Sequence, residues 1–223
     1  KKFLIKNNFI TNEWNALNVL SQNASTVGLI DLKILPNEKD DFSFFNMLEK
    51  NEFEFLYLLG SDNLQINKNN EFIVYHGSHG DRGAEIADII LPSATYTEQN
   101  GLYENLEGRV QECKKASYPI GEAKEDWKIF NLIIKKLGKK DNFINFEDLR
   151  KESLSLTKNF SEINSLPKFN TPKNDNHSVE FISEDVKIND IDYYFSNSIS
   201  RASKTMSECR QIRQKVKKTG TNN

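Results

Sequence analysis

The sequence predicts an α/β fold built on a small, mainly parallel sheet of the doubly wound kind, present only in part. Three short apolar segments, residues 53–60, 72–75 and 87–92, have the length and composition of strands, and Gly60 and Pro92 close two of them. Their almost unbroken apolar character is typical of parallel strands that are covered on both faces. Helical or looped connections separate them, which favours parallel crossovers over hairpins.

The region before the first strand is expected to hold loops and one helix. Residues 14–20 are expected to form a helix end or a short strand, and a polar turn then leads into an apolar segment with Gly28 as its flexible point. Residues 42–50 carry apolar side chains at helical spacing, with Asp41 as the expected N-cap.

The region after the third strand changes character. Residues 93–112 have no sustained period, and Gly101 and Gly108 mark bends. We therefore expect an extended, looping segment that wraps on the domain.

The clearest helix is predicted at residues 124–138. It has one apolar face, an acidic first turn, a basic last turn and a closing glycine. These positions are Trp127, Phe130, Ile134 and Leu137 on the face, then Asp126, Lys135, Lys136 and Gly138. A second helix is expected at 146–154, and residues 199–217 carry many charges at helical spacing.

These elements divide the chain into three expected parts. Residues 1–156 form the α/β portion, 157–198 an extended linker or wrapping segment, and 199–223 a C-terminal helix and tail. Three or four parallel strands leave the edges and faces of a sheet uncovered. We therefore expect this chain to complete its core against another segment or another protein.

Composition narrows the class of protein. The 223 residues have a formal net charge of −2, with 37% hydrophobic and 28% charged residues, whereas a nucleic-acid binder is normally clearly basic. No apolar run suits a membrane-spanning helix or a signal peptide, and the start at Lys1 is expected to be processed or trimmed. Cys113 and Cys209 are expected to be reduced thiols, and two cysteines do not complete a four-cysteine cluster site.

The window 76–111 concentrates residues that carry chemistry. His76 and His79 are three apart, but they follow a strand and no third ligand lies at motif spacing, so we expect two loop imidazoles rather than a metal site. Residues 77–83, GSHGDRG, lack the Gly-Lys-Ser/Thr of a phosphate-binding loop, and Asp81 would repel a phosphate. The glycines are expected to permit a tight strand-to-helix crossing with positive φ.

The other candidate groups have ordinary structural interpretations. Glu98, Glu104 and Glu107 are expected to be surface acids, one of them paired with Arg109, rather than an acid/base pair. His177 lies in a polar linker, so no Ser-His-Asp set forms. The tyrosines are expected to pack in the core or in loops; they are Tyr57, Tyr96 and Tyr103. No catalytic, cofactor-binding or metal-binding residue is predicted.

The window nevertheless resembles a known family. YHGSHGDRGAEIADIILP at 75–92 and YTEQNGLYENLEGRVQ at 96–111 are similar to the C-terminal part of the large iron–sulfur subunit of respiratory complex I, the bacterial G-type subunit and its mitochondrial 75 kDa counterpart. WNALNVLSQNASTVGLIDL at 14–32, YLLGSDNL at 57–64 and YYFSNSISRASKTMSEC at 193–209 resemble further segments, the last one from the mitochondrial and alphaproteobacterial branch. His76 and Ser78 stand where the family usually has Gln and His.

The resemblance implies a fold of the molybdopterin-oxidoreductase type around a site that no longer holds its cofactor. It implies a non-catalytic part of the peripheral arm of NADH:ubiquinone oxidoreductase, on the matrix side of the mitochondrial inner membrane or the cytoplasmic side of a bacterial one. The iron–sulfur clusters would lie on the N-terminal part of the subunit or on a partner chain. Two alternatives stay open: a fragment of a catalytic molybdopterin enzyme such as a formate dehydrogenase, and an independent nucleotide-binding α/β module.

One structural hypothesis concerns the segment after the third strand. Asn105, Glu107 and Arg109 are expected to form a hydrogen-bond network that holds this segment to the sheet. A buried Arg–carboxylate pair that is broken on one side costs about 3–5 kcal/mol. Arg109→Ala is then expected to lower stability or assembly.

Overall fold

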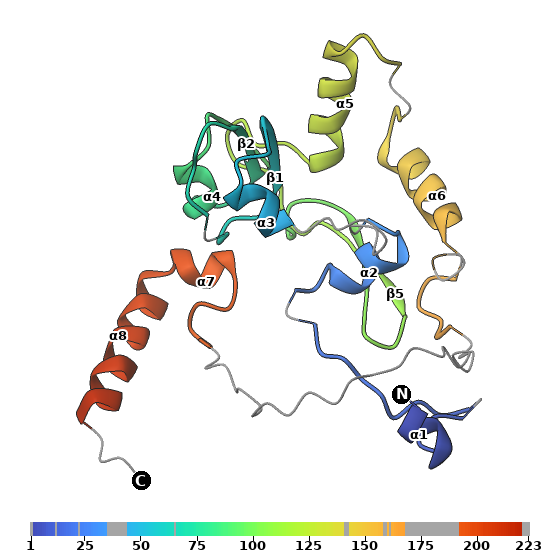
Figure 1. Cartoon of the computed structure of the whole chain (residues 1–223). Coiled ribbons are helices and arrows are strands. Elements are labelled where there is room, and N and C mark those ends of the chain that lie inside the picture. The colour runs from blue at the N-terminus through green and yellow to red at the C-terminus, as the bar shows by residue number, and fades with distance from the viewer. Residues whose placement is uncertain are drawn as a thin grey trace. The chain divides into compact units, whose positions relative to one another are not determined.

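The computed structural model describes residues 2–11, 13–21, 23–34, 44–64, 66–140, 143–157, 160, 162–167 and 192–219. The elements follow in chain order (Figure 1): α1 (Lys2–Lys6), α2 (Thr26–Asp31), α3 (Phe44–Glu49), β1 (Phe55–Leu59), β2 (Phe72–Gly77), α4 (Arg82–Glu85), β3 (Ile89–Pro92), β4 (Gly101–Glu104), β5 (Val110–Cys113), α5 (Asp126–Lys136), α6 (Phe146–Leu156), α7 (Ser198–Ala202) and α8 (Lys204–Thr219). Within this described part, none of the helices is both long and apolar enough to cross a membrane.

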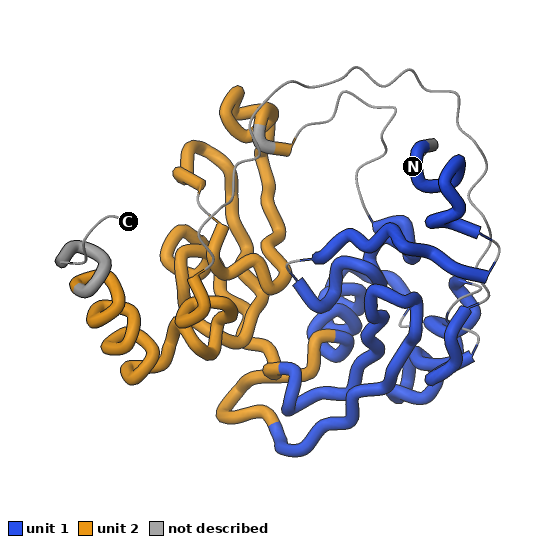
Figure 2. Tube along the Cα trace, turned by 90° about the horizontal axis from the view of Figure 1, so that it is seen from below, with its two compact units in different colours: residues 1–42, 96–118, 127–181 blue, residues 43–95, 119–126, 182–223 orange. Residues whose placement is uncertain are grey.

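The chain divides into two compact units, which Figure 2 shows in different colours. Unit 1 comprises Lys1–Phe42, Tyr96–Tyr118 and Trp127–Phe181; unit 2 comprises Ser43–Thr95, Pro119–Asp126 and Ile182–Asn223. The division at 157 and 199 stays a prediction, because much of the linker, residues 168–191, lies outside the described residues.

Unit 2 is built on the predicted parallel sheet. β1, β2 and β3 are hydrogen-bonded in that order, and both pairs are parallel. The central strand β2 supplies the deepest side chains, Ile73 and Tyr75, because it is paired on both sides. Leu48 of α3 packs into the same core, so the predicted helix at 42–50 is confirmed, while its expected cap Asp41 lies outside the described residues.

The start of β3 is held by one carboxylate. Asp88 Oδ2 accepts a hydrogen bond of 2.8 Å from the backbone N–H of Ile73, and its own N–H donates to the Ile73 carbonyl at 2.8 Å. The Ile73 N–H, followed by the Lys68 ammonium group, lowers the pKa of Asp88 below its ordinary value. This clamp fixes the register of β3 on β2.

All three strands of the sheet leave apolar side chains uncovered in the described structure. On β3, both Ile89 and Ile90 are exposed, Ile90 by 54%. The rings of Phe55 on β1 and Phe72 on β2 stack with centroids 6.3 Å apart, and both remain exposed. An apolar strand open on both faces is unusual for a parallel sheet, which is normally buried.

Unit 1 contains a feature that the sequence did not predict. Residues 101–113 form an antiparallel hairpin of β4 and β5, where an extended wrapping segment was expected. Gly108 lies in the turn with φ +81, and Asn105 Oδ1 accepts hydrogen bonds from the backbone N–H groups of Glu107 and Arg109, both at 3.0 Å. Strands of four residues are too short to show a clear alternation, which explains the wrong prediction.

The predicted helices at 124–138 and 146–154 are confirmed as α5 and α6. Gly138 has φ +71, as expected for the residue after a helix. On the predicted apolar face, Leu137 lies beyond the end of α5 and is exposed, while the buried residue of the helix is Ile129. The charged C-terminal stretch forms two helices, α7 and α8, because Ser203 adopts extended backbone angles between them.

The N-terminal predictions were partly wrong. Residues 14–20 form neither a helix end nor a strand; Asn15 alone among them makes a β-bridge, to Ile10. The helices α1 and α2 were not predicted. α2 contains Gly28 and two β-branched residues besides Ile30, so its intrinsic helix propensity is low. Gly28 packs near Glu104 and Phe160, which indicates that tertiary contacts hold this short helix.

Candidate functional site at the carboxyl edge of the sheet

The carboxyl ends of β1 and β2 lie at one edge of the parallel sheet in unit 2. β1 leads through Gly60 and Ser61 to Asp62, and β2 leads into residues 78–81 and then α4. In open α/β folds, ligands bind in the crevice outside this edge. The glycine-rich segment singled out by the sequence is therefore at the position where a site would form.

The Tyr75 side chain holds the loop formed by residues 78–81. Its buried hydroxyl donates a hydrogen bond of 2.6 Å to the backbone carbonyl of His79. A Cβ atom at Gly83 would lie 2.6 Å from the Ser61 carbonyl and 2.9 Å from the Tyr75 ring, and a Cβ at Gly77 would meet the same ring. These glycines are needed because chain segments approach closely; the expected positive φ is wrong for this loop, as the left-handed glycines lie elsewhere.

The surroundings of Tyr75 disfavour its ionised form. Burial of the phenol, and then the negative charges of Asp62 and Asp81, raise the pKa of Tyr75 to about 12, while Arg201 acts in the opposite direction. The hydroxyl therefore stays a hydrogen-bond donor over the physiological pH range, as its bond to the His79 carbonyl requires.

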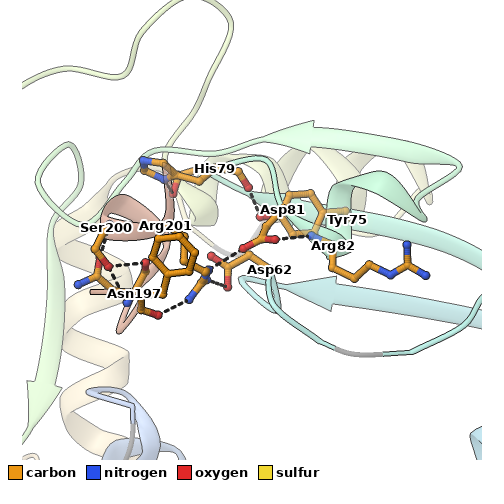
Figure 3. A network of polar contacts seen from close by, with 10 residues as sticks. Asp62, Tyr75, His79, Asp81, Arg82, Asn197, Ser200 and Arg201 are labelled. Atoms are coloured by element: carbon orange, nitrogen blue, oxygen red, sulfur yellow. Dashed lines mark hydrogen bonds and ion pairs between the residues drawn. The ribbon is translucent and has the colours of Figure 1, made fainter. Parts of the chain in front are cut away.

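A charged network adjoins this loop (Figure 3). Arg201 of α7 donates from Nε to Asp81 Oδ2 at 2.6 Å and from a terminal nitrogen to Asp62 Oδ1 at 2.9 Å. Asp81 also caps α4, since its Oδ1 accepts a hydrogen bond of 2.8 Å from the backbone N–H of Arg82. Side chains from three separate segments thus converge on the carboxyl edge.

The two histidines of the window have separate partners. His76 is fully buried, its Nδ1 lies 2.7 Å from the Tyr57 hydroxyl, and its Nε2 lies 3.0 Å from Asp126 Oδ1. An imidazole with its proton on Nε2 satisfies both contacts. His79 instead shares a 3.0 Å contact with the Ser78 hydroxyl. The expectation of a loop imidazole with local hydrogen bonds is thus confirmed for His79. It is wrong for His76, which lies in β2 and makes long-range contacts.

The Tyr57–His76–Asp126 row was not foreseen. Burial, followed by the negative charge of Asp126, raises the pKa of Tyr57 above its ordinary value of 10.0. A raised phenol pKa is the opposite of what an activated nucleophile needs. The row therefore fits a structural tie between β1, β2 and the start of α5.

The remaining candidates are dispersed among the described residues. Glu104 is buried, whereas Glu107 is exposed, so the expectation of surface acids is wrong for Glu104. Cys113 and Cys209 are both free thiols, and no three His, Cys, Asp or Glu side chains in the described part of the chain are grouped to hold a metal. His177 lies outside the described residues.

The tyrosines differ in their surroundings. Tyr96 is exposed, and Tyr57 packs edge-on against the His76 ring with centroids 5.8 Å apart. Tyr103 lines an open cavity of about 360 Å³ in unit 1. The other lining residues include Ser21, Asn23, Val27, Asn105 and Gln111.

The predicted network on the hairpin is only partly correct. Asn105 does organise the turn, but Arg109 donates to the backbone carbonyl of Asn164 at 2.8 Å. Among the described residues, this arginine has no carboxylate partner, so the expected Arg–carboxylate pair is wrong. The network joins the hairpin to residues 162–167 instead of to the parallel sheet.

The sequence did not indicate Asp62, Asp126 or Arg201 as site residues. Arg201 is 120 positions from Asp81, and Asp126 is 50 positions from His76. No local pattern joins positions this far apart, so only the fold reveals these contacts.

Comparison with known families places this site in context. Residues 1–136 match the family model of molybdopterin oxidoreductase. The chain belongs to this family. Residues 173–209 match the C-terminal model of the G-type subunit of NADH-ubiquinone oxidoreductase, so the part of the chain that supplies Arg201 is also a recognised family segment.

Curated relatives cover almost all of the chain. It is 38% identical over 91% of its length to the NADH-ubiquinone oxidoreductase 75 kDa subunit of Reclinomonas americana, and 38% identical over 98% to the G-type subunit of NADH-quinone oxidoreductase from Rickettsia bellii. It is 37% identical over 91% to the mitochondrial 78 kDa subunit of Candida albicans. The chain spans 29%, 31% and 28% of the lengths of these three relatives. The expected resemblance and the molybdopterin-oxidoreductase-type fold are confirmed.

Proposed function

We propose that this chain is a non-catalytic structural part of the peripheral arm of NADH:ubiquinone oxidoreductase. In this role it supports electron transfer from NADH to quinone by clusters that other segments or chains hold. The observation that carries the proposal is the identity of 35–38% to the G-type, 75 kDa and 78 kDa subunits over 91–98% of the chain.

The uncovered sheet supports a role inside a larger assembly. Ile89 and Ile90 on β3, with Phe55 and Phe72 across the sheet, present apolar side chains to solvent. Burying such side chains contributes about 1.5–3 kcal/mol each. The chain spans less than a third of the length of these relatives, and we propose that the remaining part of the same subunit, which holds the iron–sulfur clusters, covers this surface.

The same relatives support the proposed location, because they include mitochondrial and bacterial subunits. The chain is peripheral and reaches the membrane only through the complex. It lies on the matrix side of the mitochondrial inner membrane or on the cytoplasmic side of a bacterial one. The chain itself carries no cluster and no molybdenum cofactor in this proposal.

Purification of the chain with its partners tests the proposal. We expect chains that carry flavin and iron–sulfur clusters to co-purify, and elemental analysis to find iron but no molybdenum. Stoichiometric molybdenum would instead favour a catalytic molybdopterin oxidoreductase. A lone chain that binds a nucleotide would favour an independent nucleotide-binding module.

A pair of variants tests the proposed surface. Ile90→Lys places an ammonium group on the open strand. With the iron–sulfur-bearing part of the subunit supplied as a separate chain, we expect its recovery with the variant to fall about 10-fold, equivalent to about 1.4 kcal/mol. Ile144→Lys is the matched control, because Ile144 is 91% exposed and lies in the other unit. Equal recovery with both variants would refute the assignment of this surface.

A further inference from the structure

We propose that the carboxyl edge of the sheet is closed from within the chain, by Arg201 of the C-terminal segment bound between Asp62 and Asp81. The edge is then a guanidinium site rather than a site for the phosphate-bearing cofactor that the fold family implies. This inference deepens the proposed structural role and rests on it, because an edge filled by the chain itself serves support and not turnover.

The guanidinium group uses all three of its nitrogens. Nε donates to Asp81 at 2.6 Å, one terminal nitrogen to Asp62 at 2.9 Å, and the other to the Phe195 carbonyl at 3.5 Å. The Arg201, Asp62 and Asp81 side chains are only 16%, 15% and 30% exposed. Short charge-assisted hydrogen bonds are about twice as strong as neutral ones, and partial burial reduces the solvent screening that weakens surface ion pairs.

The two carboxylates are fixed by the sheet before the arginine is considered. Asp62 follows β1 and Asp81 follows β2, and the Gly83 N–H donates to the Asp62 carbonyl at 3.0 Å, which joins the two loops. The second oxygen of Asp81 is held by the Arg82 N–H as the cap of α4. Acceptors positioned in this way bind a planar guanidinium group with little reorganisation.

The arginine is positioned equally well by its own segment. Asn197 and Ser200 form a reciprocal capping box that begins α7 and sets the direction of Arg201. Arg210 of α8 pairs with Asp192 at 2.5 Å and lies over the Phe195 ring at 4.5 Å, which closes the turn before α7. The C-terminal segment therefore presents Arg201 from a folded unit.

The same geometry does not fit an anionic dinucleotide. Two carboxylates at the edge repel phosphate groups, whereas phosphate sites in α/β folds offer free backbone N–H groups and cations. Here the Asp81 carboxylate already accepts from the first N–H of α4, and the cation at the edge is engaged by Asp62 and Asp81. The site chemistry thus favours a cation from the chain over a phosphate-bearing cofactor.

Hydrogen exchange of the full chain, within the assembly that it purifies with, tests the proposal. In Arg201→Ala we expect exchange in residues 61–64, 78–83 and 198–202 to become about 10- to 100-fold faster, the effect of losing hydrogen bonds to charged groups. Low millimolar guanidinium chloride should restore protection, and sodium chloride at equal ionic strength should not. Lys204→Ala is the control, because its pair with Glu208 is exposed.

Two further variants keep the proposal testable if Arg201→Ala fails to fold. Asp62→Asn removes the negative charge at this position without touching the α4 cap, and Arg201→Lys keeps the positive charge but loses the forked guanidinium group. Both substitutions should speed exchange in the same loops. Unchanged exchange in all three variants would overturn the inference. So would protection of the wild-type loops by added GDP, which serves as a phosphate-bearing probe. If the wild-type chain purifies without flavin-bearing and iron–sulfur-bearing partners while these exchange effects persist, the proposed function alone is refuted.

Discussion

Removing the Tyr75 hydroxyl is expected to have an effect on stability that reverses at alkaline pH. In the Tyr75→Phe variant, the His79 carbonyl loses a hydrogen bond of 2.6 Å. At neutral pH this loss should lower the free energy of unfolding by about 1–2 kcal/mol. In the wild type, however, ionisation of the Tyr75 phenol at high pH lowers the stability of the folded state.

The size of the reversal follows from the pKa shift. Burial, together with Asp62 and Asp81, raises the pKa of Tyr75 from 10.0 to about 12. Because the folded pKa is the higher one, the stabilisation is fully present below pH 10 and is lost as pH rises through about 12. Two pKa units correspond to at most about 2.7 kcal/mol, and solvent screening near the loop reduces this to about 1.5–2.5 kcal/mol.

Urea unfolding followed by circular dichroism measures this difference as a function of pH. We expect the wild type to be the more stable protein up to pH 10, and its advantage over Tyr75→Phe to vanish or change sign near pH 12. Tyr118→Phe, at an exposed phenol, controls for the loss of one tyrosine. A gap between wild type and Tyr75→Phe that stays constant over this range would refute the reasoning.

Three other substitutions test the packing, each by the midpoint and slope of urea unfolding. Gly83→Ala should lower the free energy of unfolding by about 1–3 kcal/mol, because its Cβ would lie 2.6 Å from a backbone oxygen. Gly80→Ala should leave it nearly unchanged, because a Cβ there would have nothing within 4 Å. Equal effects of the two substitutions would contradict the close approach at Gly83. Ile73→Ala should cost about 2–5 kcal/mol, since this side chain is fully buried in β2, and a cost near zero would show that the core is elsewhere. Arg109→Ala should lower the free energy of unfolding by only about 1–2 kcal/mol, because its partner is a carbonyl group. A decrease of about 4 kcal/mol would instead indicate the buried Arg–carboxylate pair expected from the sequence.

Much of the fold was predictable because its signals are local. The strands near 53–60, 72–75 and 87–92 have continuous apolar runs, and their connections are too long for hairpins, so both position and parallel pairing followed from the sequence. The hairpin at 101–113 was missed because its strands have four residues each. The loop after β2 was located correctly, but Gly77 and Gly83 serve close approach to Tyr75 rather than positive φ.

By itself, the sequence determined where the three parallel strands and the main helices lie, and to which family the chain belongs. These properties depend on neighbouring residues and on short motifs. Only the tertiary structure decided that Arg201 meets Asp81 and that His76 meets Asp126, since 120 and 50 residues separate the partners along the chain. Long-range ionic and hydrogen-bonded contacts depend on where loops and helix ends come to rest, and no local spacing encodes that.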